Sequence, residues 1–327
     1  MARRSCDRRP DRRGPGLADE GQGVTGMAAG DMVTAPGHVQ YGDVLLGPGT
    51  PYRWQTLTGW EDSPGLDSGT VPRADAHGAI PGRLLAQLRT ITVDGLVLRA
   101  DPGAVGTAVR HLAAATALTD TERPLVVRLD DSPPLLSWAR CIRRAIPVAK
   151  GGYAVGVVVG GALQFEASDP RRYALVEQRV EARLPMPEPG LDWHLAPGPE
   201  HLDWPLNFGA PGSTGALAAV NDGDAPAHPV ITFRGPVTLP SLTNVESGDR
   251  IEYDLALAAD DELTVDTAAG TVTLNGTASR LYTVTARSAP EATFTLPPGT
   301  TNFAFRAAPG ATDPRAACSV RWRSAYW

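Results

Sequence analysis

Histidine, aspartate and tryptophan gather in one short segment, residues 191–205, where a metal site could form. His194 and His201 lie close to two Asp-Trp pairs, which begin at Asp192 and Asp203. A metal site needs ligands held at fixed distances by a rigid scaffold, and the chain around these residues is interrupted by prolines. The other histidines show no HExxH or paired-ligand spacing. The sequence therefore predicts no metal and no cofactor.

Acidic side chains form a second candidate site, for calcium, in residues 249–266. Calcium binds several oxygen ligands that converge from one loop. Here the acidic residues are separated by strand-like stretches, so a solvated sheet edge is the favoured interpretation. The residues concerned are Asp249, Asp254, Asp260, Asp261, Glu262 and Asp266.

No set of nucleophile, base and orienting residue can be assembled, so the sequence predicts that the chain is not an enzyme. It has no Walker loop, no GxSxG and no GxGxxG that leads from a strand into a helix. The glycine-rich run 156–161 lies between two strand-like stretches and offers no helix start to a phosphate. Cys6, Cys141 and Cys318 are far apart in sequence, and we expect buried free thiols at the last two.

The distribution of charge argues against a nucleic-acid surface. Residues 1–36 hold 6 basic and 5 acidic residues, 37–190 hold 16 and 16, and 191–327 hold 8 and 15, so the nets of +1, 0 and −7 sum to −6. Glycines interrupt the longest apolar run, residues 153–165, and no run approaches the ~20 residues of a membrane helix. We therefore expect no specific nucleic-acid binding and no membrane insertion.

Residues 1–36 are predicted to form a disordered tail. They alternate arginine with aspartate, then become rich in glycine, and contain too little apolar surface to order themselves. They include no apolar segment typical of a secretory signal. Methionines precede the first folding signals, so a translation start at Met1, Met27 or Met32 stays open.

The elements that would position any site begin at about residue 37. A length of 327 residues favours about two domains, and 35 glycines with 30 prolines favour short strands and tight turns. We predict a β-rich domain with one helix over residues 37–190. Within it, residues 62–82 are predicted to be a turn-rich loop and Asp94-Gly95 a hairpin turn. Asp101-Pro102 predicts the start of a helix that ends near residue 120.

Two long strands, residues 138–146 and 154–167, form the candidate oligomer interface of this domain. They are longer than the sheet of a small domain usually requires, so a neighbouring copy could complete them. Packing within the chain is the alternative. The predicted interface has an apolar face with Trp138, Ile142 and Ile146, and a basic face with Arg140 and Arg144.

Residues 191–205 are predicted to be a proline-rich linker, and residues 206–327 a β-sandwich. After the linker, apolar and polar residues alternate as in half-buried strands, for example over residues 263–274, and turns such as Asn275-Gly276 separate the strands. The predicted fold class is mainly β: an α+β first domain with one helix, followed by the sandwich.

Three passages, in this order, resemble the distal tail protein family of long-tailed bacteriophages. They extend over about residues 37–327 and identify the chain as a Dit-like, siphovirus-type minor tail component. The second passage, LQFEASDPRRY, is similar to the family's F-x-A-x-D-P-x-x-Y. The three passages are Tyr41–Gly47 with Trp54, then residues 163–173, then a C-terminal run that includes residues 274–276, 297–299 and 320–323.

The resemblance implies a structural protein of the virion at the distal end of the tail. It implies a homo-hexameric ring built by the first domain, with the second projecting outward as a galectin-like sandwich. The partners it implies are the tail tube protein and a tail-tip or fibre protein. The chain has no length to spare for an inserted carbohydrate-binding module. A carbohydrate-binding adhesin that uses the sandwich is the alternative, with Tyr326 and Trp327 as candidate contacts for a sugar or partner.

Overall fold

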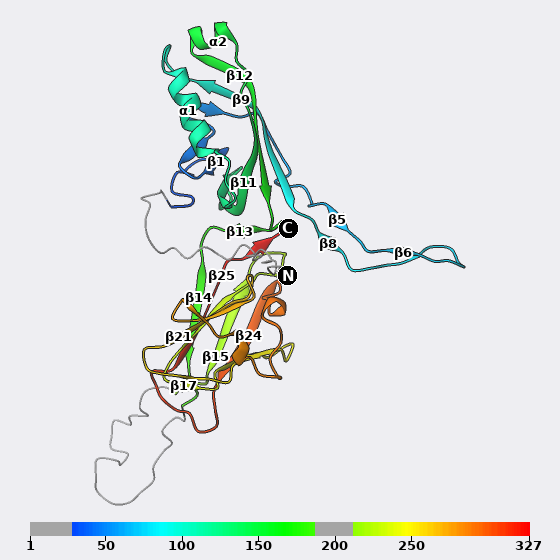
Figure 1. Ribbon diagram of the computed structural model, residues 1–327, viewed down its shortest axis with the longest axis vertical. Coiled ribbons are helices and arrows are strands. Elements are labelled where there is room, and N and C mark those ends of the chain that lie inside the picture. Colours follow the sequence, from blue (N-terminus) through cyan, green and yellow to red (C-terminus); the bar gives the residue numbers. More distant parts are fainter. Residues whose placement is uncertain (1–27, 187–211) are drawn as a thin grey trace, which may run out of the picture. The chain divides into compact units, whose positions relative to one another are not determined.

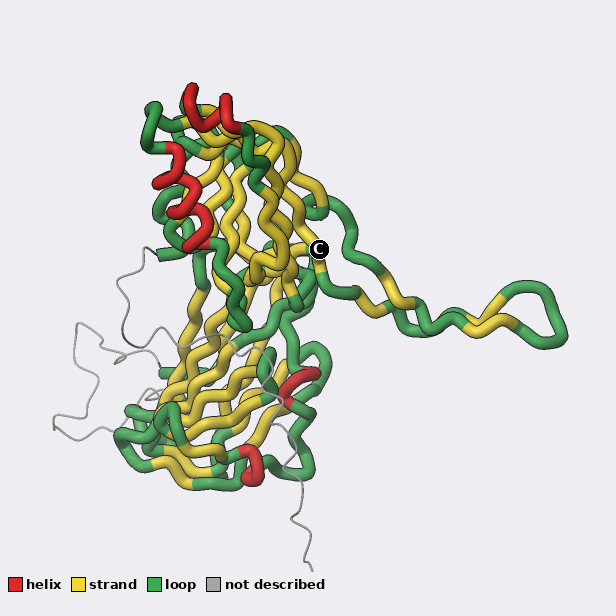
Figure 2. The backbone as a smooth tube through the Cα atoms, turned by 45° about the horizontal axis from the view of Figure 1, so that its top comes forward, coloured by secondary structure: helices red, strands yellow, loops and turns green. Residues whose placement is uncertain are grey.

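The computed structural model describes residues 28–186 and 212–327, and these form two compact units. Figures 1 and 2 show that sheets build both units, and the described residues contain two short α-helices. The mainly β prediction is therefore confirmed. The N-terminal unit comprises residues 28–177, 222–225 and 323–327. The sandwich unit comprises residues 178–186, 212–221 and 226–322.

One ten-stranded sheet frames the N-terminal unit. Three of its strands pair off the main path, namely β4 (Thr56–Thr58), β13 (Arg172–Ala174) and β26 (Ala325–Tyr326). The other seven follow one another in the order β2 (Val44–Leu46), β1 (His38–Tyr41), β10 (Arg123–Arg128), β11 (Leu135–Ala145), β12 (Val157–Ala167), β9 (Arg89–Arg99) and β3 (Tyr52–Arg53). Every pairing along this path is antiparallel.

A single amphipathic helix, α1 (Val105–Ala115), covers the main core of this unit. Leu112 is fully buried in a core that also holds Tyr41 and Phe165, whose ring centroids lie 4.8 Å apart. The helix begins later than predicted, because Gly103 adopts a left-handed φ of 92° and no side chain caps the helix start.

The Asp94-Gly95 pair lies inside a continuous strand, so the hairpin-turn prediction was wrong. The register between β9 and β12 shifts at this point, and Gly95 has a left-handed φ of 65°. A left-handed glycine at such a bulge bends and twists a strand without ending it. Sequence alone does not separate this bulge from a turn.

Residues 28–36 are ordered, which corrects the prediction of a disordered tail over residues 1–36. The side-chain oxygen of Gln40 accepts hydrogen bonds from the N–H groups of Gly30 (3.0 Å) and Met32 (3.2 Å). Val33 is buried in a small cluster on β10 and β11. The buried side-chain amide of Gln40 thus satisfies two backbone N–H groups of this segment. Residues 1–27 lie outside the described residues.

Two sheets face each other across the core of the sandwich unit. Phe233 of the larger sheet and Phe305 of the smaller are both fully buried, with ring centroids 5.9 Å apart. The larger sheet has the order β14 (Gln178–Arg183), β25 (Ala317–Trp322), β16 (Val230–Arg234), β21 (Glu262–Asp266), β22 (Thr271–Leu274) and β23 (Ala278–Ser279). The smaller has the order β15 (Ala216–Asn221), β24 (Gly299–Arg306), β18 (Ser241–Asn244) and β19 (Arg250–Glu252).

The limits of the units differ from the predicted domains, residues 37–190 and 206–327. β14 belongs to the sandwich unit, because all six of its residues pair with β25. In contrast, β26 pairs with β13 and returns the chain to the N-terminal unit. The predicted proline-rich linker, residues 191–205, lies outside the described residues.

The D-P-x-x-Y passage shapes the turn between β12 and β13 through one carboxylate. Asp169 accepts hydrogen bonds from the backbone N–H of Arg171 (3.1 Å), from its Nε (2.8 Å) and from the Tyr173 hydroxyl (2.5 Å). Burial, together with the charge of Asp169, raises the pKa of Tyr173, so this hydroxyl remains a donor. The Tyr173 ring then packs edge-on against Trp138, with centroids 5.4 Å apart.

Candidate assembly surface

A long two-stranded arm leaves the sheet of the N-terminal unit between β4 and β9 (Figures 1 and 2). We define the arm as residues 63–88. Near its tip, the N–H of Arg73 donates a hydrogen bond to the carbonyl of Gly78 (3.1 Å). The predicted turn-rich loop over residues 62–82 is therefore an extended ribbon. Its paired strands are β5 (Leu66–Asp67) with β8 (Leu85–Ala86), and β6 (Val71–Pro72) with β7 (Ala79–Ile80).

Large aliphatic side chains lie exposed along the arm. A two-stranded ribbon has no second layer to cover them and is only marginally stable by itself. Fully burying one such side chain contributes roughly 1.5–3 kcal/mol. The arm thus presents apolar surface that the described part of its own chain leaves uncovered, as interaction surfaces do. The exposed fractions lie between 48% and 63% for Leu66, Val71, Ile80, Leu84, Leu85 and Leu88.

The amino-acid composition of the arm conceals its paired strands in the sequence. Val71 opposes Ile80, and Asp67 opposes Leu85. The first pair is centred between residues 75 and 76 and the second on residue 76, so the two ladders belong to one hairpin with a register shift of one residue between them. Glycine and proline occur so often between them that the strand period is lost.

The buried side chain of Arg89 joins the two sides of the chain at the base of the arm. We define residues 59–62 and Arg89 as the arm root. From Nη1 the Arg89 guanidinium donates to the carbonyls of Gly59 (2.8 Å), Trp60 (3.0 Å) and Asp62 (2.7 Å). From Nε it donates to the carbonyl of Pro170 (2.6 Å). The residue is only 2% exposed, and Nη2 has no hydrogen-bond partner among the described residues. A single side chain therefore collects four main-chain carbonyls at the point where the arm begins.

Arg172 is the second cation at the arm root. Its guanidinium carbon lies 5.9 Å from the centroid of the Trp60 ring, and its Nη1 lies 2.8 Å from a carboxylate oxygen of Glu61. Its Nη2 donates to the Trp327 carbonyl. Desolvation, followed by the charge of Arg172, lowers the pKa of Arg89. Glu61 offsets this repulsion, so the root holds two neighbouring guanidinium groups and a carboxylate.

The predicted division of residues 138–146 into an apolar and a basic face was wrong. Residues separated by two or four positions lie on the same side of a regular strand, so Trp138 and Arg140 share a side. A bulge between Cys141 and Arg143 then exchanges the sides of β11. The side of the sheet on which even-numbered residues lie therefore changes within the stretch that the prediction treated as a regular strand.

The five predicted interface residues consequently have different environments. Trp138 is half-buried, and Ile146 packs against the main core. Arg140 forms an ion pair of 2.6 Å with a carboxylate of β12, and Arg144 donates to the carbonyl of Thr116, the residue that follows α1 (3.0 Å). Ile142 is 41% exposed. Of the five, only Ile142 keeps an exposed apolar side chain.

Further apolar side chains are exposed toward the end of the hairpin that β11 and β12 form. Its connection contains the short helix α2 (Lys150–Val155), and Val148, Val155 and Val159 are all exposed. We call residues 138–162 the basic hairpin, because they contain four basic residues and no acidic residue. This hairpin combines exposed valines with positive charge.

The two C-terminal aromatic residues lie in the N-terminal unit, so their assignment to the sandwich was wrong. Tyr326 pairs with Arg172 in the ladder between β26 and β13, and burial raises its pKa. Trp327 is 41% exposed, and its N–H donates to a carboxylate oxygen of Asp224 (2.8 Å). The chain leaves the sandwich after Trp322, which alternation within β25 does not reveal.

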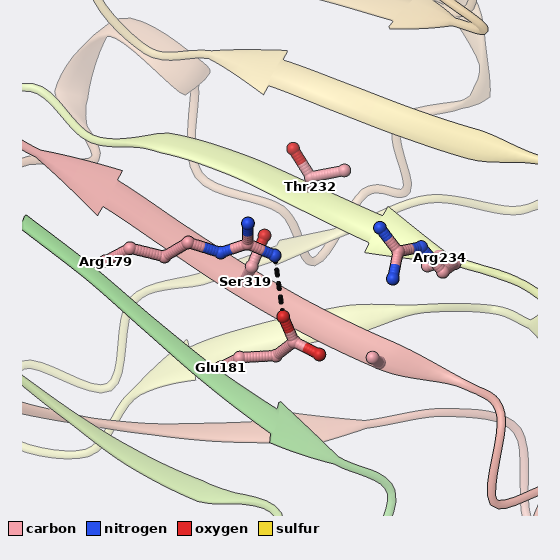
Figure 3. A pocket seen from close by; sticks show the side chains of 6 residues that line it. Arg179, Glu181, Thr232, Arg234 and Ser319 are labelled. Atoms are coloured by element: carbon pink, nitrogen blue, oxygen red, sulfur yellow. Dashed lines mark hydrogen bonds and ion pairs between the residues drawn. The ribbon is translucent and has the colours of Figure 1, made fainter.

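A small, shallow polar depression lies on the larger sheet of the sandwich unit (Figure 3). Two ion pairs flank it, between Arg179 and Glu181 (2.6 Å) and between Arg234 and Glu262 (2.9 Å). Its lining contains no aromatic side chain. A row of cross-strand partners crosses the sheet at this level: Glu181, Ser319, Thr232, Thr264, Thr273 and Ser279.

Among the described residues, no group of three or more histidine, cysteine or acidic side chains could hold a metal ion. His194 and His201 lie outside that part of the chain. Cys141 and Cys318 are buried free thiols, as predicted, and burial raises the pKa of each. No helix in residues 28–186 or 212–327 is long and apolar enough to cross a membrane.

Sequence and structure comparisons point to one family. Residues 222–326 match the family model of the siphovirus-type tail component, C-terminal domain. The crystal structure of the Dit protein of phage SPP1, described as a paradigm of the hub adsorption apparatus in phages that infect Gram-positive bacteria, has the same fold. It aligns with a TM-score of 0.58 and 13% identity over 84% of this chain and 94% of that chain. The chain is thus Dit-like in fold, and in sequence over residues 222–326.

Two further structures align with the Dit-like chain over 84% of its length. They are the activated baseplate of phage P2 with Ca and the same baseplate with Sr, each with a TM-score of 0.45, 9% identity and 91% of that chain covered. No curated protein matches the chain. The resemblance to distal tail proteins is thus confirmed for the Dit-like chain, and it supports a structural component of a phage tail.

Proposed function

We propose that the Dit-like chain is a non-catalytic structural component that forms a closed ring at the distal end of a phage tail. In this proposal the ring joins the tail tube protein to the tail-tip or fibre proteins. The number of copies, six, comes from the resemblance to distal tail proteins. The observation that carries the proposal is the arm, because its exposed aliphatic side chains require a covering surface.

The arm can make repeated contacts between copies, and the choice of a ring over a two-fold dimer rests on the resemblance to distal tail proteins. It extends from one part of the N-terminal unit (Figure 1), and a different part of the next copy has to receive it. Such head-to-tail contacts generate a ring when the rotation between copies closes. We propose the basic hairpin as the receiving surface, because its exposed apolar side chains include Ile142, Val148 and Val155. This assignment retains part of the interface predicted from residues 138–146.

The test is the mass of the assembled full chain with and without its arm. Mass photometry and light scattering are expected to show a ring-sized species for the intact chain. Replacing residues 64–87 by a short glycine turn is expected to leave a folded monomer, as judged by unchanged unfolding of the N-terminal unit. A ring-sized species in the absence of the arm would refute the arm as the assembly element. A monomeric intact chain at high micromolar concentration would refute the ring itself.

The partners and location require a separate test on virions. Electron microscopy of tails labelled with an antibody against the sandwich unit is expected to show label at the distal end. Label along the whole tube would contradict the proposed location. Loss of tip proteins from tails that lack the chain would support the proposed joining role.

A carbohydrate-binding adhesin remains the second candidate function, because the polar depression on the sandwich offers hydrogen-bonding groups to sugar hydroxyls. Arg179, Thr232 and Arg234 line it and lie around its centre in Figure 3. Calorimetry with host wall polysaccharide tests this function, with Thr232→Val as the variant. Trp327, an exposed aromatic residue of the N-terminal unit, provides the comparison. Binding that Trp327→Ala abolishes, and Thr232→Val leaves intact, would move the sugar site to the N-terminal unit.

A further inference from the structure

The main-chain pairing that holds the arm to its sheet is interrupted at the arm root. The ladder between β4 and β9 ends at the pair Thr58 and Thr92. Pairing between the two sides of the chain resumes only in the arm, where the N–H of Gln87 donates to the carbonyl of Gly65 (2.7 Å). The returning side stays fixed throughout this gap, because Arg89 and the residues after it pair with β12. The outgoing side has no such partner strand between residues 59 and 64.

The Arg89 side chain takes the place of the missing ladder. Its three hydrogen bonds to the carbonyls of Gly59, Trp60 and Asp62 hold the outgoing side against the returning side. Close approach at Gly59 supports this arrangement, since a Cβ there would lie 1.9 Å from the carbonyl oxygen of Thr90. The close contact between Gly59 and the Thr90 carbonyl, together with the Arg89 guanidinium, thus sets the direction in which residues 63–88 leave the sheet.

Burying the Arg89 guanidinium at the arm root is energetically unfavourable. Arg89 leaves one terminal nitrogen without a partner among the described residues and lies beside a second cation, Arg172. A well-packed apolar side chain would avoid both penalties. An apolar side chain, however, could not bind the carbonyls of the outgoing segment, so it would leave the arm free to pivot at its root.

We propose that Arg89 is a positioning residue for assembly, which fixes the exit direction of the arm so that its contact with a second copy of the chain closes. This inference rests on the proposed ring function. A head-to-tail contact closes only when the rotation between copies has one value, and otherwise it extends into open chains. A small angular error at the root becomes a large displacement at the tip of an arm of this length. Arg89 therefore acts on closure without touching the neighbouring copy.

The decisive experiment compares Arg89→Lys with Arg110→Lys in the full chain. Lysine keeps the charge but lacks the planar fork that reaches several carbonyls at once. Arg110 is an exposed residue of α1, outside the arm and the basic hairpin, so its replacement is the matched control. For Arg89→Lys, we expect hydrogen exchange of residues 59–66 to become at least ~10-fold faster. We expect closed rings, counted by electron microscopy at equal concentrations of folded protein, to give way to open oligomers and monomers.

The outcomes separate this inference from the ring proposal. If the unaltered chain forms no ring, the proposed function fails and the inference fails with it. If the unaltered chain and Arg89→Lys both form closed rings although the root exchanges faster, the positioning role alone is overturned. Should Arg89→Lys unfold the N-terminal unit, Arg89→Met replaces it, because an apolar side chain removes the unpaired buried nitrogen together with all four carbonyl contacts of residue 89. Faster root exchange with fewer closed rings in that variant supports the clamp, and unchanged closure together with faster exchange overturns it.

Discussion

The arm and the hairpin of β21 and β22 are both short antiparallel ribbons that carry valine, leucine or isoleucine, yet their side chains have opposite fates. Leu263, Val265 and Val272 are at most 1% exposed, whereas Val71 and Ile80 of the arm are 60% and 59% exposed. The difference lies in the second layer. The smaller sheet of the sandwich covers the β21–β22 hairpin, and no part of the described chain covers the arm. Apolar composition therefore shows that a surface will be buried, and the fold shows whether the chain itself or a neighbour buries it.

The largest effect is expected when a charge replaces an apolar residue in the covered ribbon. Val265→Asp places a carboxylate in the sandwich core, where it has no cationic partner at its level of β21. We expect a loss of about 4 kcal/mol or more in the free energy of unfolding of the sandwich unit. Urea unfolding followed by tryptophan fluorescence measures it. A stable Val265→Asp protein would show that this ribbon is less firmly covered than its burial indicates.

The same substitution in the arm is expected to affect assembly and leave stability almost unchanged. Ile80→Asp should shift the free energy of unfolding by less than about 0.5 kcal/mol, as surface substitutions usually do. It should nevertheless reduce ring formation strongly, measured by light scattering over a concentration series. Thr70→Asp adds the same charge at an exposed polar position of the arm and serves as the control. Equal assembly of both variants would mean that no neighbour covers Ile80.

A further pair of substitutions compares Ile142 in β11 with Ile146, which directly follows that strand. Ile146 packs against the main core, so Ile146→Asp should cost roughly 1–3 kcal/mol of unfolding free energy. Ile142 is 41% exposed at the bulge, so Ile142→Asp should instead weaken assembly. Thermal unfolding and light scattering separate the two effects. If Ile142→Asp destabilises the unit as much as Ile146→Asp, the bulge does not divide these side chains as described.

The smallest effect is expected from an exposed ion pair of the sandwich unit. Hydrogen bonds from Arg315 lower the pKa of Asp313 from 3.8 to about 2. A carboxyl with a lowered folded-state pKa contributes its stabilisation above the unfolded value and loses it as the pH falls toward the folded value. Asp313→Asn should therefore flatten the fall in melting temperature between about pH 4 and pH 2 slightly. An unaltered pH profile would show that solvent screens this pair completely.

Period-two alternation made much of the sandwich predictable, because strands such as β15, β16 and β21 have one face on the core. Leu263 with Val265, and Val272 with the turn that precedes it, identify β21 and β22 directly. The D-P-x-x-Y passage was equally readable, since its contacts join residues only two to four positions apart.

The arm, the bulges and the return of the chain were not predictable in the same way. The Arg89 hydrogen bonds join residues 27 to 81 positions apart, and no local pattern encodes such contacts. The bulge at Cys141 reverses the parity of β11, so a regular period assigns the later side chains to the wrong side. In the arm, glycine and proline remove the alternation that would mark its strands.

Because β26 pairs with β13, the sheet of the N-terminal unit can be completed only after the sandwich sequence has been synthesised. Because translation proceeds from the N-terminus, the ribosome completes the whole sandwich sequence before β26 emerges. Until then one edge of β13 stays open to solvent, and an open edge pairs readily with other chains. A nascent chain therefore cannot finish its N-terminal sheet while its sandwich is still being made. Sequence order alone therefore delays completion of the first unit until the second has been made, and the exposed edge of β13 has to be protected during that interval.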